Sequence, residues 1–142
     1  MKSRHLGVLA ILLASCHAAP NGALLHHRAE NALGPYSAAV EAGSLVFVSG
    51  KIGEQVDAFA REAETAMEAV GAELARRNLS FSDVVAATVY LTDMKRYAEF
   101  NEIYARYFTK PFYPARACVA VAALPRAARV EVQVTAYRRK KD

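Results

Sequence analysis

The 142-residue sequence lacks the motifs that assign many short chains to a known class of protein. It has no tryptophan, only two cysteines, and no internal repeat or low-complexity segment. It contains neither the Cys and His spacing of a zinc site nor the glycine-rich loops that hold phosphates or dinucleotides. These absences argue against a zinc protein and against a nucleotide-dependent enzyme, and the length indicates one small domain.

Long hydrophobic runs are absent as well. The apolar run from Leu6 to Leu13 is too short to cross a bilayer. It follows the positive charges of Lys2 and Arg4 and precedes small residues, an order typical of a secretory signal. The sequence therefore predicts a signal peptide over residues 1–15.

The end of this signal contains a possible lipid attachment site. Leu13-Ala14-Ser15-Cys16 resembles a bacterial lipobox, after which Cys16 becomes the lipid-modified first residue. We predict lipidation of Cys16, a tether over residues 16–31, and a protein anchored to a membrane in the cell envelope or periplasm. Cleavage near Ala19, giving a secreted soluble protein, is the alternative. If Cys16 carries lipid, Cys118 has no cysteine partner and a disulfide framework is excluded.

Positive charge is concentrated at the two ends of the chain. The formal net charge is +4, from 18 Lys and Arg residues against 14 Asp and Glu residues. Six of the basic residues belong to the signal or to the C-terminal tail, namely Lys2, Arg4, Arg138, Arg139, Lys140 and Lys141. The body of the chain is therefore near neutral, unlike a nucleic-acid groove, and no nucleic-acid partner is expected.

Two alternating segments near the C-terminal end carry candidate chemistry. Arg116 and Cys118 alternate with apolar residues. In segment 130–137, valines alternate with polar residues, and Glu131 is the first of these polar residues. Because strand side chains alternate between faces, a hairpin across residues 124–129 would place the guanidinium, thiol and carboxylate on one face. An arginine suits a substrate carboxylate and a glutamate suits proton transfer with water. The structural alternative is an Arg116–Glu131 ion pair beside an inert, buried Cys118.

The remaining elements indicate an α+β fold. Apolar periodicity predicts a strand over 45–50, a helix over 56–77 and a strand over 84–91. Thr92-Asp93 can cap a second helix, which Lys110-Pro111 ends, and an edge segment lies near 34–41. Both helices are expected on one face of the sheet. The other face then needs a cover, so we expect other subunits to provide it and to place a site at their interface.

Seven short motifs in a specific order extend this interpretation. They are Gly34-Pro35-Tyr36-Ser37, Val48-Ser49-Gly50, Thr88-Val89-Tyr90-Leu91-Thr92-Asp93-Met94, Asn101-Glu102-Ile103-Tyr104, Pro114-Ala115-Arg116-Ala117-Cys118-Val119, Ala123-Leu124-Pro125 and Val130-Glu131-Val132. Through them the sequence resembles the Rid/YjgF family, whose best-known members are reactive-intermediate (imine/enamine) deaminases. The resemblance runs from about Gly34 to Arg138, within a predicted domain over 32–142.

The resemblance implies a chorismate-mutase-like unit with a mixed β-sheet, two helices on one face, and a trimeric barrel with ligand clefts between subunits. The family's ligand-contacting residues match Tyr36, Ser49, Asn101, Arg116, Cys118 and Glu131. The implied substrates are 2-imino or 2-enamino acids such as 2-iminopropanoate and 2-iminobutanoate, hydrolysed to 2-keto acids and ammonia. Arg116 would hold the carboxylate and Glu131 would act on the water. No metal or organic cofactor is implied.

One departure from the family pattern leaves other functions open. Where typical deaminases continue with Gln-Ile-Pro and a longer loop, this sequence has Lys51-Ile52-Gly53 and a shorter connection. That loop is expected near the cleft, so the change could alter access or activity. The first alternative is a non-catalytic binder of small carboxylates or carbonyl compounds. The second is an endoribonuclease or translation inhibitor, against which the near-neutral body argues.

Overall fold

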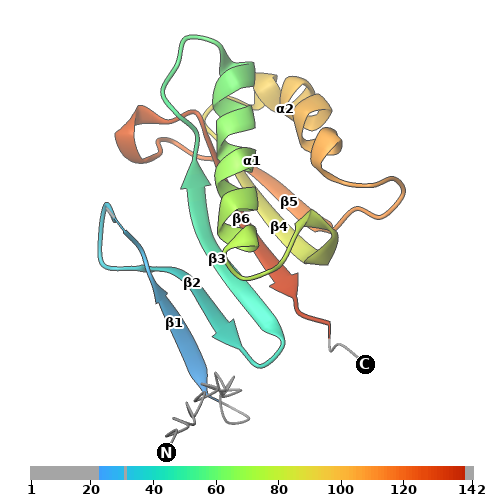
Figure 1. Cartoon of the computed structure of the whole chain (residues 1–142). Helices are drawn as coiled ribbons and strands as arrows, with labels where there is room; N and C mark the ends of the chain where they lie inside the picture. The colour runs from blue at the N-terminus through green and yellow to red at the C-terminus, as the bar shows by residue number, and fades with distance from the viewer. Residues whose placement is uncertain (1–22, 31, 140–142) are drawn as a thin grey trace, which may run out of the picture.

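The domain is built on one mixed six-stranded sheet with two helices packed on one face (Figure 1). The computed structural model describes residues 23–30 and 32–139. The strands are β1 (Leu24–Arg28), β2 (Ser37–Ala42), β3 (Leu45–Ile52), β4 (Val84–Leu91), β5 (Ala115–Ala120) and β6 (Val130–Tyr137). The helices are α1 (Phe59–Ala75) and α2 (Tyr97–Tyr104), and short 3₁₀ turns cover Phe81–Asp83, Met94–Arg96, Ala105–Tyr107 and Pro125–Ala127. The predicted α+β class and helix placement are confirmed.

The strands are ordered β1-β2-β3-β6-β4-β5 across the sheet. All neighbouring pairs are antiparallel except β4 and β5, which are parallel. A parallel pair needs a crossover connection, and α2 supplies it between β4 and β5. The predicted β5–β6 hairpin is therefore wrong, because β4 lies between these two strands. Alternation along a strand sets which side chains share a face, but it does not determine which strands become neighbours.

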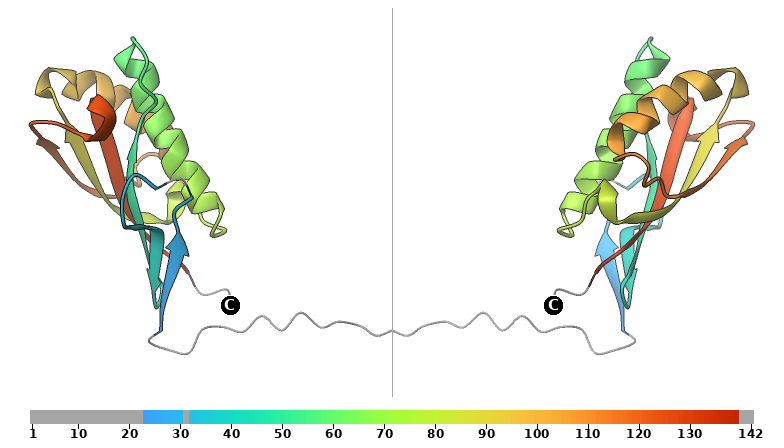
Figure 2. Two further views of the ribbon diagram at one scale, coloured as in Figure 1. Left: turned by 90° about the vertical axis from the view of Figure 1, so that its left-hand side faces the viewer. Right: turned by 90° about the vertical axis from the view of Figure 1, so that its right-hand side faces the viewer.

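The core lies between the sheet and its two helices. The side chains of α1 that face the sheet include Met67, Val70 and Leu74, all fully buried. Below them lie the inward side chains of β3 and β6, among them Val48 and Val132. Each such buried side chain contributes about 1.5–3 kcal/mol relative to exposure. In the side views of Figure 2, α1 runs along one side of the sheet and no described helix covers the other side.

The N-terminal boundary of the domain differs from the prediction. The tether was expected to include residues 16–31, but Leu24–Arg28 form strand β1 and pair antiparallel with β2. The His27 ring lies 2.8 Å from the Glu41 carboxylate across this pair. Backbone pairing with an edge strand thus brings residues before 32 into the fold, although their composition is not strand-like.

The signal peptide and Cys16 lie outside the described residues, so their processing stays a prediction. Within residues 23–30 and 32–139, no helix is both long and apolar enough to span a membrane.

Candidate functional site

The two residues expected to carry the chemistry lie on opposite faces of the sheet. Glu131 on β6 is in register with Tyr90 on β4, and Tyr90 is in register with Val119 on β5. Partners in register point to the same face, so Val119 shares the helix-free face with Glu131. Arg116 is three residues before Val119 and points to the helix-covered face. The predicted single-face cluster is therefore wrong: Arg116 and Cys118 share one face, and Glu131 lies on the other.

Arg116 is held by one face of α2. Its Nη2 donates hydrogen bonds to Asn101 Oδ1 at 2.8 Å and to the Tyr97 hydroxyl at 3.3 Å. Its guanidinium carbon lies 4.6 Å from the ring centre of Tyr104 and 5.7 Å from that of Tyr97. Residues 97, 101 and 104 follow helical spacing, so a single helix face can present all three. The side chains of α2 therefore hold the Arg116 guanidinium in one orientation at β5, the edge strand of the sheet.

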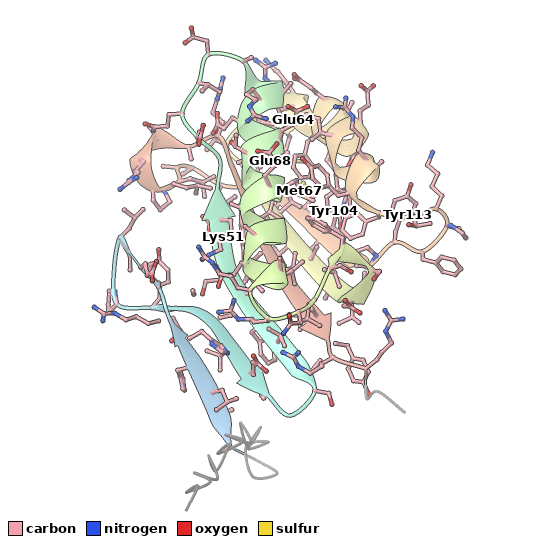
Figure 3. The ribbon with its side chains drawn as sticks, viewed as in Figure 1. Lys51, Glu64, Met67, Glu68, Tyr104 and Tyr113 are labelled. Atoms are coloured by element: carbon pink, nitrogen blue, oxygen red, sulfur yellow. The ribbon has the colours of Figure 1, made fainter. Side chains whose placement is uncertain are left out.

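A pocket of about 290 Å³ lies beside this arginine. Its lining residues are Asn101, Tyr104, Ala105, Tyr113, Pro114 and Arg116. Tyr104 and Tyr113, labelled in Figure 3, come from α2 and from the loop that leads into β5. Burial raises the pKa of Tyr104 to about 12 even though Arg116 opposes the shift, so its hydroxyl stays protonated. That hydroxyl is buried and has no hydrogen-bond partner within the described part of the chain.

Cys118 follows Arg116 on the same face and packs against the hydrophobic core. Burial raises the pKa of its thiol, and the neighbouring Arg116 only partly opposes this. The side chain is therefore a neutral thiol near pH 7, a poor nucleophile. Among the predicted ligand contacts, Cys118 lines neither the pocket beside Arg116 nor the pocket beside Glu131.

The Glu131 half of the site is a separate pocket on the helix-free face. It has a volume of about 190 Å³ and is lined by Leu33, Tyr36, Ser49, Gly50, Ile52, Pro125 and Glu131. Three of the six predicted ligand contacts, Tyr36, Ser49 and Glu131, thus come together here. The Ser49 hydroxyl donates a 2.6 Å hydrogen bond to the carbonyl of Ser37, which fixes its direction. The Tyr36 side chain is 47% exposed, so its ring remains accessible to a ligand.

Glu131 packs directly over Gly50. A Cβ atom added to Gly50 would lie 1.7 Å from Glu131 Oε1, so only glycine leaves room for the carboxylate in this position. The β3–β6 ladder shifts register between Val48 and Lys51, which is where this close approach occurs. Burial raises the pKa of Glu131 above its ordinary value. A carboxyl group shifted in this direction is a better proton acceptor near neutral pH.

Lys51 does not lie in the Glu131 pocket. It is in register with fully buried Val132, and its Nζ lies 3.2 Å from Glu73 Oε2 on α1. Figure 3 shows Lys51 on β3 beside α1. Lys51 itself therefore does not reach this pocket, because the register shift in β3 turns its side chain to the helix-covered face. Its neighbour Ile52 lines the pocket instead.

Sequence reasoning missed Tyr97, Tyr104 and Gly50 as members of these two half-sites. Their signals were available but ambiguous. An aromatic face at helical spacing usually belongs to a core, and a glycine after a strand usually belongs to a turn. Only the structure shows that Tyr97 and Tyr104 contact Arg116 and that Gly50 makes room for Glu131.

Known proteins share both this fold and much of the sequence. A family model described as Endoribonuclease L-PSP matches residues 26–138. Protein DfrA of Myxococcus xanthus is 45% identical over 119 residues, covering 77% of this chain and 89% of that protein. The human 2-iminobutanoate/2-iminopropanoate deaminase is 38% identical over 116 residues, covering 77% and 84%. The crystal structure of E. coli TdcF with bound serine superposes with a TM-score of 0.72 at 37% identity, covering 79% and 94%.

The chain therefore belongs to the Rid/YjgF (L-PSP) family, as its motifs indicated. Trimeric assembly is typical of this family.

Proposed function

We propose that this protein hydrolyses reactive 2-imino or 2-enamino acids, such as 2-iminopropanoate and 2-iminobutanoate, to 2-keto acids and ammonia. The observation that carries the proposal is that α2 holds the Arg116 guanidinium in place while leaving some of its donors free. Asn101 and Tyr97 occupy only Nη2, and Nη1 and Nε have no protein partner among the described residues. A fixed guanidinium with open donors suits a two-pronged hydrogen bond to a carboxylate. The name of the human relative, 2-iminobutanoate/2-iminopropanoate deaminase, supports the same substrate class.

The active site in this proposal is completed between subunits of a homotrimer. Glu131 and Arg116 lie on opposite faces of one sheet, so a compact substrate cannot contact both within one chain. β5 is the edge of the sheet, so Arg116 can reach a neighbouring copy. The helix-free face exposes large apolar side chains, including Phe47 and Val119 at 43% and 42% exposure, which a second copy would cover. Trimers are typical of the family, which supports this arrangement.

The chemistry needs only these side chains and water. Arg116 binds the substrate carboxylate and orients the neighbouring C=N carbon toward the Glu131 pocket of the next subunit. Glu131 accepts a proton from water as the water oxygen bonds to that carbon. Glu131 returns this proton to the nitrogen of the resulting carbinolamine. The C–N bond then breaks as the hydroxyl oxygen forms the C=O bond and gives its proton to Glu131, which releases ammonia and the keto acid. Tyr36 and Ser49 would orient the water or the substrate, and Cys118 would shape the arginine side of the cleft.

The alternative of a non-catalytic binder rested on the shortened connection after Gly53 and on the altered residue Lys51. That side chain is bound to Glu73 on the other face of the sheet, so it neither blocks nor recharges the Glu131 pocket. The description of the family model as an endoribonuclease keeps RNA cleavage as an activity to test.

The direct test is hydrolysis of 2-iminopropanoate, generated in situ from an amino acid, by the purified full-length protein. We expect accelerated release of pyruvate and ammonia, and a loss of at least 100-fold in Arg116→Ala, as for removal of a charged group that orients substrate. Arg106→Ala is the matched control, because Arg106 is an exposed arginine that contacts Glu64 instead of the site. A folded trimer that binds pyruvate without accelerating hydrolysis would establish the binder, and cleavage of RNA would establish the ribonuclease.

We further propose that the enzyme works in the cell envelope, anchored through Cys16. The proposal rests on the lipobox-like segment Leu13-Ala14-Ser15-Cys16 and on the positive charge and apolar run before it. Fractionation of cells that produce the wild type and Cys16→Ser tests it. The variant should lose the processed, membrane-bound form, and its unchanged appearance in membranes would show that Cys16 is not the anchor.

A further inference from the structure

A second polar pocket lies at the other edge of the sheet from Arg116. Its volume is about 270 Å³, and its lining residues are His27, Arg28, Glu30, Glu73, Arg76 and Arg77. They come from β1 and its end and from the C-terminal end of α1. His27 is in register with Ala39 and, through it, with fully buried Val48, so β1 meets α1 on the helix-covered face. The pocket shares no lining residue with either half of the deaminase site.

One buried carboxylate at this pocket is shared by three cations. Glu73 is 3% exposed, and its Oε2 lies 3.2 Å from both Lys51 Nζ and Arg76 Nη1. Its Oε1 lies 2.6 Å from Arg77 Nη1. Burial acts to raise the pKa of Glu73, but the attraction of Lys51, Arg77 and Arg76 outweighs it and holds the pKa below its ordinary value. A single negative charge therefore faces three positive ones.

The other groups around the pocket do not remove this excess. Arg28 adds a further positive charge and Glu30 one negative charge. His27 is paired with Glu41, which also accepts a hydrogen bond from Arg138. The C-terminal end of α1 contributes a partial negative charge of roughly one half, which offsets only part of the surplus.

Arg77 holds a largely buried guanidinium beside the pocket. The residue is 7% exposed, and its Nε has no hydrogen-bond partner within the described part of the chain. Buried donors without partners are rare because leaving them unpaired is unfavourable. Glu73 Oε1 is likewise buried without a hydrogen bond within the described residues, so the Arg77–Glu73 pair is incompletely satisfied, and the Arg77 guanidinium lies beside any oxygen ligand that enters the pocket.

We propose that this basic pocket binds a small polyvalent oxyanion, with Arg28, Arg76 and Arg77 as its principal ligands. The planar guanidinium matches the paired oxygens of phosphate and of carboxylates, so inorganic phosphate and small polycarboxylates share the required chemistry. The pocket lies on the helix-covered side of the sheet, away from the helix-free face that subunits would cover. It is therefore a site distinct from the deaminase cleft, and its occupation does not depend on the deaminase proposal.

Thermal unfolding of the full-length protein at constant ionic strength tests this site. Titrations with phosphate and with citrate are compared with sodium chloride, and the anion that gives the larger saturable rise in Tm identifies the preferred chemistry. In the double variant Arg28→Gln/Arg76→Gln, Glu73 keeps Lys51 and Arg77 as partners. We expect its Kd for the preferred anion to be at least tenfold weaker. Arg76→Lys, which keeps the charge but loses the planar guanidinium, should bind the anion more weakly than the wild type and more tightly than the double variant.

Two matched variants show where the anion binds. Arg61 is an exposed arginine on the same helix, bound to Glu64 and Glu68, and Arg61→Gln should bind the anion like the wild type. Arg116→Ala should also retain the saturable rise. The proposal is overturned if no anion gives a saturable rise, if the double variant binds as tightly as the wild type, or if Arg116→Ala alone abolishes the effect, which would assign the anion to the deaminase cleft.

Discussion

Arg116 and Glu131 point to opposite faces of the same sheet, and strand β4 separates the strands that carry them. Neighbouring strands are about 4.8 Å apart, so the two strands lie roughly 10 Å from one another even before their side chains diverge. In a single chain the pair can neither form an ion pair nor hold one small substrate between them. Their combined action requires a second copy of the chain.

This separation predicts complementation between two inactive variants. Arg116→Ala and Glu131→Gln each lose one half of every site, but a mixed trimer pairs an intact Arg116 with an intact Glu131 at some interfaces. After unfolding and refolding a 1:1 mixture, about a quarter of the sites should be restored if subunits assort randomly in a cyclic trimer. Steady-state deaminase activity measures the recovery. Activity that stays at the level of the separate variants would mean that each site lies within one chain.

The support of Arg116 by α2 predicts a defect in substrate binding when that support is removed. Asn101→Ala removes the 2.8 Å hydrogen bond to the guanidinium, and Tyr97→Phe removes only the longer one from Nη2 to the hydroxyl. A hydrogen bond to a charged group contributes about 1.5–3 kcal/mol, so KM should rise roughly tenfold or more in Asn101→Ala. The rise should be smaller in Tyr97→Phe, which keeps the ring.

Both variants should change KM more than kcat, because Arg116 remains present but less well oriented. Steady-state kinetics with 2-iminopropanoate separates the two constants. An unchanged KM in Asn101→Ala would show that the substrate itself orients Arg116 without help from α2.

The contact between Gly50 and Glu131 predicts a variant that loses activity while keeping most of its stability. In Gly50→Ala the new methyl group would occupy the position of the Glu131 carboxylate, whose flexible end can move away. We expect at least a tenfold fall in kcat with a small change in Tm. Gly34→Ala is the control, since the nearest atom to its added Cβ is Tyr36 Cδ1 at 3.9 Å. Full activity in Gly50→Ala would remove Glu131 from the proposed mechanism.

The raised pKa of Glu131 predicts an acidic limb in the pH dependence of kcat/KM. Only the ionised carboxylate can accept a proton, and burial shifts its ionisation to a pH above the ordinary value of 4.5. Activity should therefore fall as the pH decreases through this raised pKa. Glu131→Gln should lack this limb, and a limb that persists in its residual activity would assign the titration to another group.

The same shift has a consequence for stability with the opposite sign. The folded state favours protonated Glu131, so its contribution is largest below pH 4.5 and is lost as the pH rises through the raised pKa. Glu131→Gln should therefore unfold at a Tm equal to or above that of the wild type at pH 7. Scanning calorimetry at pH 4 and pH 7 measures this difference.

Local patterns in the sequence predicted most elements but not their neighbours. The strand over 84–91 was predicted with the bounds that the structure has, because the segment is rich in β-branched residues, which favour strands. The valines of β6 were correctly placed on a buried face. The β5–β6 hairpin was wrong because β5 carries small residues that fit beside several partners, and the crossover through α2 selects β4.

The sequence by itself determined the family, the fold class and the residue types at the site, because ordered motifs and hydrophobic periodicity are local properties of the chain. The tertiary structure decided that Arg116 and Glu131 occupy opposite faces, that Lys51 turns toward Glu73, and that β1 belongs to the sheet. These outcomes depend on strand order and on a register shift in β3, and one residue of register moves a side chain to the other face. Strand order and register are both set by pairing between segments far apart in the sequence, so local sequence patterns do not predict them.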